Sequence, residues 1–137
     1  MRVSVWSVLA LLVVLMAGIA GCGTQAPRSL PPDTAPSKEV LVAYLQALVA
    51  GDCATARALS TPENVANNGV WCDRPRVTSF GSTGDGAGPT DNEIVYAVSI
   101  TTVGGDLSLP DAERLWFYDL RRQPNGAWRV YGSGSGP

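Results

Sequence analysis

Histidine is absent from this chain of 137 residues, and lysine occurs only once, as Lys38. Without an imidazole, the chain lacks the side chain that most often moves protons near neutral pH and most commonly binds metals. Charged residues are also scarce, at 16%, and ten basic against twelve acidic residues give a formal net charge of −2. That balance provides no basic field for nucleic acid. We therefore expect no metal site, no cofactor and no nucleic-acid partner.

Only one hydrophobic run is long, and it covers residues 3–16 with two serines as its polar interruptions. It is shorter than the roughly 20 apolar residues that a membrane-spanning helix needs. Small residues follow at 17–21, as signal peptidases require, and lead directly to Cys22. We predict that residues 1–21 are a signal peptide. An uncleaved membrane anchor is the alternative.

The four residues Ile19-Ala20-Gly21-Cys22 resemble the lipobox of bacterial lipoproteins. In that motif the Cys sulfur receives a diacylglyceryl group and the chain is cut just before it; the usual leucine at the first position is isoleucine here. The resemblance implies a mature protein that begins at an acylated Cys22, with palmitate among its fatty acids. Such a protein is anchored to the cell membrane by its lipid, on the extracytoplasmic face. A secretory signal followed by a spare cysteine is the other interpretation.

The chain has three cysteines, so any disulfide scheme leaves one over. Acylation of Cys22 would leave Cys53 and Cys72 as an even pair in an oxidising compartment. Their spacing fits neither a CxxC redox site nor a zinc site. We expect a structural disulfide between Cys53 and Cys72, which would contribute about 3 kcal/mol of stability in the chain-entropy model.

Proline content separates the rest of the chain into segments. Residues 22–36 hold four prolines and are expected to form a tether, which would span about 40 Å when fully extended. Residues 37–132 are expected to form one domain, and residues 133–137 a flexible tail.

The hydrophobic period changes halfway along the expected domain. Apolar residues recur at helical spacing after Ser37, the expected N-cap, and stop at Gly51. Asp52 and Thr61 are expected to cap two short helices. Alternating residues then predict strands at 76–82, 93–103, 114–122 and 128–131, with a loop at 81–89. The sequence therefore predicts an α+β fold, in which one long and two short helices pack on a curved antiparallel sheet of about four strands.

This arrangement resembles the NTF2-like superfamily of cone-shaped, SnoaL-like α+β domains. The matching features are the long helix that runs into GDCATAR (51–57), the two short helices, and the final hairpin that ends in WRVY (128–131). More narrowly, the chain is similar to the small disulfide-bearing NTF2-like lipoproteins of high-GC Gram-positive (actinobacterial) bacteria. A cystatin-like sheet with one helix is the alternative fold.

The superfamily resemblance implies a pocket between the concave sheet and the helix, where its enzymes place an Asp, often with a His or Tyr. Tyr96, Trp116 and Tyr118 fall on the apolar face of the expected sheet and are predicted to hold any ligand. Glu93 and Asp119 fall on the opposite face, where a carboxylate stays hydrated with a nearly normal pKa. Asp119 is expected to pair with a neighbouring arginine.

These observations predict no catalytic residue. We expect a lipid-anchored, non-catalytic binding or accessory module for a small apolar ligand or an envelope protein partner. A pocket enzyme of the isomerase or dehydratase kind and a purely structural envelope component are the alternatives. An unpaired carboxylate buried in an enclosed pocket would favour the enzyme, and a cone filled by side chains would favour the other two.

Overall fold

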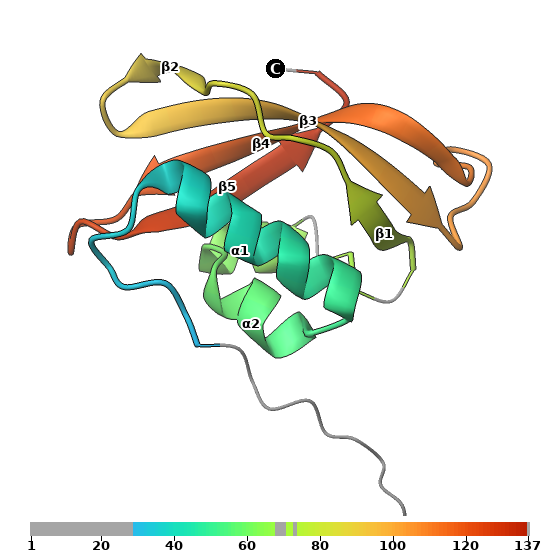
Figure 1. Cartoon of the computed structure of the whole chain (residues 1–137), viewed down its shortest axis with the longest axis horizontal. Helices are drawn as coiled ribbons and strands as arrows, with labels where there is room; N and C mark the ends of the chain where they lie inside the picture. The colour runs from blue at the N-terminus through green and yellow to red at the C-terminus, as the bar shows by residue number, and fades with distance from the viewer. Residues whose placement is uncertain (1–28, 68–70, 73, 137) are drawn as a thin grey trace, which may run out of the picture.

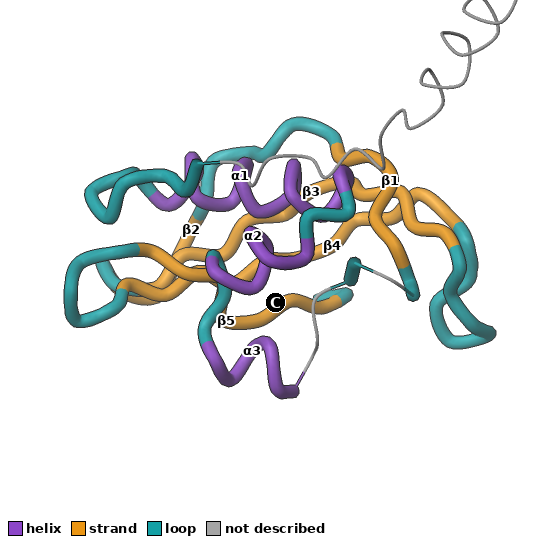
Figure 2. Tube along the Cα trace, turned by 90° about the horizontal axis from the view of Figure 1, so that it is seen from below, coloured by secondary structure: helices purple, strands orange, loops and turns teal. Residues whose placement is uncertain are grey.

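Three helices pack on one face of an open antiparallel sheet of five strands (Figures 1 and 2). The computed structural model describes residues 29–67, 71–72 and 74–136, and these counts refer to that part of the chain. The predicted signal peptide, Cys22 and residues 23–28 of the predicted tether lie outside the described residues. The elements are α1 (Ser37–Ala50), α2 (Cys53–Ala58), α3 (Pro62–Asn67), β1 (Arg76–Phe80), β2 (Ala87–Thr90), β3 (Glu93–Val103), β4 (Ala112–Arg122) and β5 (Trp128–Gly134).

The α+β prediction is confirmed, and the sheet is built around β3 and β4. These two long strands pair from Glu93 opposite Arg121 to Thr102 opposite Ala112. β5 lies on the other side of β4. β1 pairs with the C-terminal half of β3 and β2 with its N-terminal half, so together they form one interrupted edge of the sheet.

Helix α1 lies across the sheet, and its apolar stripe faces the strands (Figure 1). We call the side of the sheet that faces α1 the inner face, and the opposite side the outer face. Val49 follows the helical spacing of the same stripe but is 37% exposed at its margin. Gly51 ends the helix with a φ of 70°, a left-handed conformation that glycine adopts without steric cost. The stripe residues that are at most 3% exposed are Val40, Leu41, Tyr44, Leu45 and Leu48.

Ser37 does not cap α1, contrary to the prediction. The N-cap position is Pro36, and Ser37 is the first helical residue. The Ser37 side chain is buried, and its Oγ is hydrogen-bonded to the Tyr96 Oη on β3 at 2.9 Å. The long-range contact thus uses the hydroxyl that a local cap would have required.

The two short helices have the predicted caps. The Thr55 backbone N–H donates to Asp52 Oδ1 at 3.1 Å, and the Asn64 N–H donates to Thr61 Oγ1 at 3.3 Å. The segment between α2 and α3 also pairs with the free edge of β5. The Thr61 N–H donates to the Val130 carbonyl, and the Val130 N–H donates to the Leu59 carbonyl, both at 2.9 Å. The helices therefore protect an edge that would otherwise be open to pairing with another chain.

Two strand predictions need correction. The segment at 81–89 was predicted as a loop, but β2 begins within it, so the sheet has five strands among the described residues and not about four. β2 contains glycine and proline and is exposed throughout, so it has no alternating pattern to detect. β5 continues past Tyr131 to Gly134, since Ser133 pairs with Tyr118 and Gly134 with Phe117. It therefore includes two residues of the predicted tail.

The predicted disulfide is present between Cys53 and Cys72, whose Cα atoms are 5.6 Å apart. It joins the start of α2 to the segment that precedes β1. Cys72 is buried and Cys53 is partly buried against the core. The bond therefore closes the connection between the helical layer and the sheet.

Reduction of this disulfide should lower the free energy of unfolding by about 2–5 kcal/mol, because the unfolded chain gains conformational freedom. Urea denaturation with and without dithiothreitol measures the difference. The Cys53→Ala/Cys72→Ala double variant is the control, and its stability should not respond to the reductant. Two alkylatable thiols at these positions in unreduced native protein would contradict the assignment.

Candidate functional site

The three residues predicted to hold a ligand lie on the inner face and are buried by the protein itself. Tyr96, Trp116 and Tyr118 are 5%, 9% and 1% exposed. Trp116 packs against Trp71 with 4.7 Å between ring centroids. Tyr118 stands opposite Tyr96 in the β3–β4 register and meets Tyr44 of α1 edge to face at 5.9 Å. The structure brings the three together in the core, and their role in ligand binding stays a prediction.

Two of the inner-face tyrosines are kept neutral by their surroundings. Burial raises the pKa of Tyr44 to about 12, although a hydrogen bond with Ser60 acts in the opposite direction. The pKa of Tyr118 is raised well above its ordinary value, first by burial and then by the neighbouring Tyr44. Tyr118 Oη has no hydrogen-bond partner among the described residues. Neither phenol ionises near neutral pH, so neither is suited to act as a base there.

The polar residues buried in the described part of the chain are all uncharged. Within residues 29–67, 71–72 and 74–136, no three His, Cys, Asp or Glu side chains are placed to hold a metal ion. The helices of the same ranges lack the length and apolar character needed to cross a membrane. The buried polar residues are Ser37, Thr55, Ser60, Thr61, Asn64, Thr83 and Thr102.

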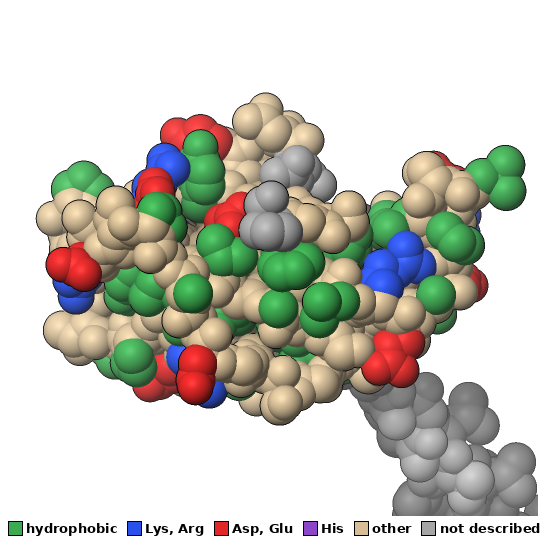
Figure 3. Space-filling view, turned by 90° about the horizontal axis from the view of Figure 1, so that it is seen from above, with side chains coloured by type: hydrophobic (Ala, Val, Ile, Leu, Met, Phe, Trp, Pro, Cys, Tyr) green, Lys and Arg blue, Asp and Glu red, His purple; other side chains and the backbone are tan. Residues whose placement is uncertain are grey.

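The outer face is open and carries apolar side chains among charged ones. Viewed from the sheet side in Figure 3, hydrophobic groups gather over the middle of the molecule, with charged groups around them. Leu115 on β4 is 57% exposed and Tyr131 on β5 is 38% exposed. Val95 and Phe117 are half-buried on the same face. Apolar groups on a solvated sheet face are typical of a surface that contacts another molecule.

A row of three cavities follows this face and the adjoining end of the sheet. The central cavity, of about 250 Å³, is named the Asp119 cavity. It shares Glu93 and Arg121 with a cavity of about 610 Å³ at the β4–β5 turn. It shares Pro89 and Val95 with a third of about 470 Å³ beside β2. The walls of the Asp119 cavity are Pro89, Glu93, Ile94, Val95, Asp119, Leu120, Arg121 and Tyr131.

A fourth cavity, of about 440 Å³, lies apart from this row, between Arg74 and the loop that follows β3. None of the four cavities has Tyr96, Trp116 or Tyr118 in its walls. The hollows of the described surface are therefore formed by residues other than the predicted ligand-binding set.

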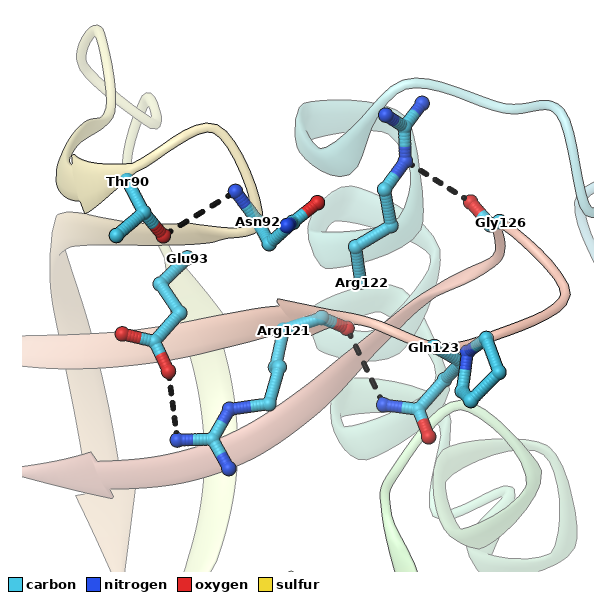
Figure 4. Close-up of a pocket in the computed structure, with 8 residues that line it drawn as sticks. Thr90, Asn92, Glu93, Arg121, Arg122, Gln123 and Gly126 are labelled. Carbon is cyan, nitrogen blue, oxygen red and sulfur yellow. Dashed lines mark hydrogen bonds and ion pairs between the residues drawn. The ribbon is translucent and has the colours of Figure 1, made fainter.

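Arg121 is fixed between two partners at the boundary of the first two cavities. Its Nη2 lies 2.7 Å from Glu93 Oε1, and the two residues stand directly opposite in the β3–β4 register (Figure 4). Its guanidinium carbon lies 3.6 Å from the centre of the Tyr131 ring. An ion pair and a cation–π contact together hold the guanidinium in one orientation. On the far side of the larger cavity, Arg122 Nε donates to the Gly126 carbonyl at 3.3 Å.

Asp119 does not pair with an arginine, contrary to the prediction. Arg121 is engaged by Glu93, and Arg129 lies 3.3 Å from Asp33. Among the described residues, the Asp119 carboxylate has no hydrogen bond and no ion pair. The reason is positional, because the residues directly opposite Asp119 on β3 and β5 are Val95 and Gly132, which carry no charge.

The pKa of Asp119 also departs from the nearly normal value that was predicted. Its pKa is raised, first by partial burial and then by the negative charge of Glu93, while Arg121 acts in the opposite direction. The carboxylate lies beside a β-bulge, because the register between β4 and β5 shifts between Asp119 and Leu120. A Cβ at position 132 would lie 3.3 Å from Asp119 Oδ2, so Gly132 leaves the space that the carboxylate occupies.

The sequence places Glu93, Asp119 and Arg121 on the outer face but does not reveal the cavity that they line. Pro89 belongs to a strand without an apolar pattern, and Tyr131 is positioned by the bulge. The pairing of Glu93 with Arg121 follows only from the register between their strands. If the turn between β3 and β4 had been placed first, counting residues outward from it along both strands would have suggested this pairing.

The chain matches no protein-family model, and no curated protein is significantly similar to it in sequence. The assignment of a function therefore depends on the geometry of the described residues and on the patterns of the sequence.

Tyr96 and Tyr118 allow a matched test of the inner face. Tyr96→Phe should destabilise the protein by about 1 kcal/mol, because it leaves the buried Ser37 hydroxyl without its partner. Tyr118→Phe should be neutral or stabilising, because it removes a buried hydroxyl that has no partner among the described residues. Urea denaturation of both variants compares them. An equal loss for Tyr118→Phe would mean that its hydroxyl is satisfied in solution.

Asp119→Asn should raise stability at pH 7 by less than about 1 kcal/mol, since the site is partly solvated. The folded-state pKa of Asp119 is raised, so ionisation disfavours the folded state, and stability falls as pH rises from the unfolded pKa through the folded one. Below both pKa values the wild type is protonated and the difference should vanish. Denaturation at pH 7 and pH 3 measures it, with Asp91→Asn as control. A variant less stable than wild type at pH 7 would contradict the assignment.

Proposed function

We propose that this chain is a lipid-anchored extracytoplasmic binding or accessory module that engages its partner through the outer face of the sheet. The observation that carries the proposal is the contrast between the two faces. The inner face is packed against α1 with Tyr96, Trp116 and Tyr118 buried, and the outer face carries exposed apolar groups and a row of cavities. Of the expected partners, an envelope protein fits such a face best.

The anchoring part of the proposal is supported by the sequence that precedes the described domain. A hydrophobic run, small residues and Ile19-Ala20-Gly21-Cys22 are followed by a proline-rich stretch. The disulfide is consistent with an oxidising compartment. Residues 29–36 lie on the helix side of the sheet, opposite the outer face (Figure 1).

The non-catalytic part is supported by the chemistry of the two faces. The buried polar groups of the described residues are hydroxyls and an amide, and the partly buried carboxylate of Asp119 lies on the outer face, outside the core. A pocket enzyme of the isomerase or dehydratase kind would need a carboxylate among the inner-face groups. An inner face filled by side chains therefore favours binding over turnover.

The NTF2-like cone is part of the same proposal. A long helix followed by two short ones, all on one face of the sheet, fits that superfamily better than a cystatin-like sheet with one helix. The sheet order β1-β3-β4-β5 fits the expected meander of strands. The absence of a matching family model leaves this likeness as one of arrangement.

Anchoring predicts that the mature protein begins at Cys22, carries lipid and partitions into a detergent phase. Cys22→Ser should leave an unacylated, full-length precursor, because the modified sulfur is what the processing step requires. Intact-mass analysis of both proteins from membranes measures the difference. A free thiol at Cys22 in mature protein, or cleavage at another position, would contradict the anchor.

Binding to a partner is tested by photocrosslinking in cells that express the lipidated protein. A benzophenone amino acid in place of Leu115 sits on the outer face, and the same group in place of Leu107 sits on the more exposed loop between β3 and β4. We expect a discrete crosslinked product from position 115, little from position 107, and loss of that product with Cys22→Ser. Equal crosslinking from both positions would contradict a docking role for the outer face.

A further inference from the structure

The Asp119 cavity contains a carboxylate that forms no ion pair with the described residues. Glu93 and Arg121 form an ion pair at 2.7 Å, so their charges offset each other. The Arg121 guanidinium also lies over the Tyr131 ring at 3.6 Å, and among the described residues it forms its ion pair with Glu93 and none with Asp119. Within the part of the chain that the structure describes, the Asp119 carboxylate accepts no hydrogen bond, and it lies in a partly enclosed space. A carboxylate in such surroundings gains most from an incoming cationic N–H donor.

The other walls of the cavity indicate what the donor is attached to. Val95 stands directly opposite Asp119 on β3, and Pro89 and Tyr131 complete an apolar surround. A group that reaches the carboxylate must pass these side chains, so a hydrocarbon stem would lie against them. Walls of this kind disfavour a strongly hydrated ion without a stem.

The size of the cavity limits the ligand. Its volume of about 250 Å³ is below the range of roughly 300–1,000 Å³ that is usual for drug-sized ligands. The space therefore suits one side chain or a small amine and does not suit a nucleotide or a large cofactor.

We propose that the Asp119 cavity binds a single alkylammonium or alkylguanidinium group, whose N–H donates to the Asp119 carboxylate and whose stem lies on Val95, Pro89 and Tyr131. This inference rests on the proposed binding function and specifies the chemistry that the outer face recognises. The group belongs either to a Lys or Arg side chain of the partner or to a free small amine. Arg121 positions the site, because it neutralises Glu93 and keeps one net negative charge in the cavity.

The test is an NMR titration of the ¹⁵N-labelled full chain in non-ionic detergent at pH 7. The probes are n-butylammonium and n-butylguanidinium, with n-butylurea as the neutral probe and n-pentanoate as the anionic one. We expect saturable shifts at the amides of Val95, Asp119 and Tyr131 with the two cations. Affinity for the better cation should fall about tenfold or more in Asp119→Asn, as loss of a charge-assisted hydrogen bond requires.

Asp91→Asn is the matched control, because it removes the same charge from an exposed turn residue that does not line the cavity. Its affinity for the cations should stay within about twofold of the wild type, since an exposed charge outside the cavity is screened by water and salt. Three results would overturn the inference: no saturable shifts with either cation, equal losses in the two variants, or equal binding of n-butylurea. Crosslinking from position 115 tests the proposed binding function independently of this titration. It could still succeed after any of the three results, and the two proposals can therefore fail separately.

A final arm distinguishes the two sources of the ligand. The peptides acetyl-Gly-Arg-Gly-amide and acetyl-Gly-Lys-Gly-amide present the same groups on a backbone. Tighter binding of a peptide than of its alkyl probe would identify a partner side chain, and weaker binding would identify a free amine. Both results require the same loss in Asp119→Asn, and a peptide that binds that variant unchanged would contradict the assignment.

Discussion

The packing of α1 across the inner face of the sheet is the interaction on which the rest of this structure depends. Its apolar stripe is buried against α2 and the inner face of the sheet, where it contacts β1, β4 and β5. Tyr96 on β3 and Trp116 and Tyr118 on β4 belong to the same core. This packing takes precedence over local helix capping. The Ser37 hydroxyl is hydrogen-bonded to Tyr96 on β3 and does not cap its own helix. Burial of this area also explains why two phenols are held neutral.

One consequence is that the two faces of the sheet have different roles. The inner face is committed to stability, and the groups available to another molecule lie on the outer face, where β2, the bulge at Asp119 and the Glu93–Arg121 pair form a row of cavities. This separation is the physical basis for proposing a binding module, and it puts the carboxylate of Asp119 on the face that a partner can reach.

Much of the fold follows from sequence periodicity, because the patterns that identify α1, β3 and β4 are the same patterns that bury their apolar faces. The disulfide followed from counting cysteines. β2 was missed because an exposed strand of glycine and proline has no hydrophobic signature. The state of Asp119 was missed because it depends on the register that pairs Arg121 with Glu93 and sets Gly132 beside the carboxylate, and register is a property of the folded sheet.

Adjacent residues of β4 provide the most direct test of this division between the faces, because they alternate between them within one peptide. Carbene footprinting of the purified protein and of native membranes measures the accessibility of each side chain. The account predicts labelling of Leu115 and Phe117 in the purified protein, their protection on membranes, and almost no labelling of Trp116 and Tyr118 in either sample. Comparable labelling of Trp116 and Tyr118 in the purified protein, or protection confined to them on membranes, would contradict it.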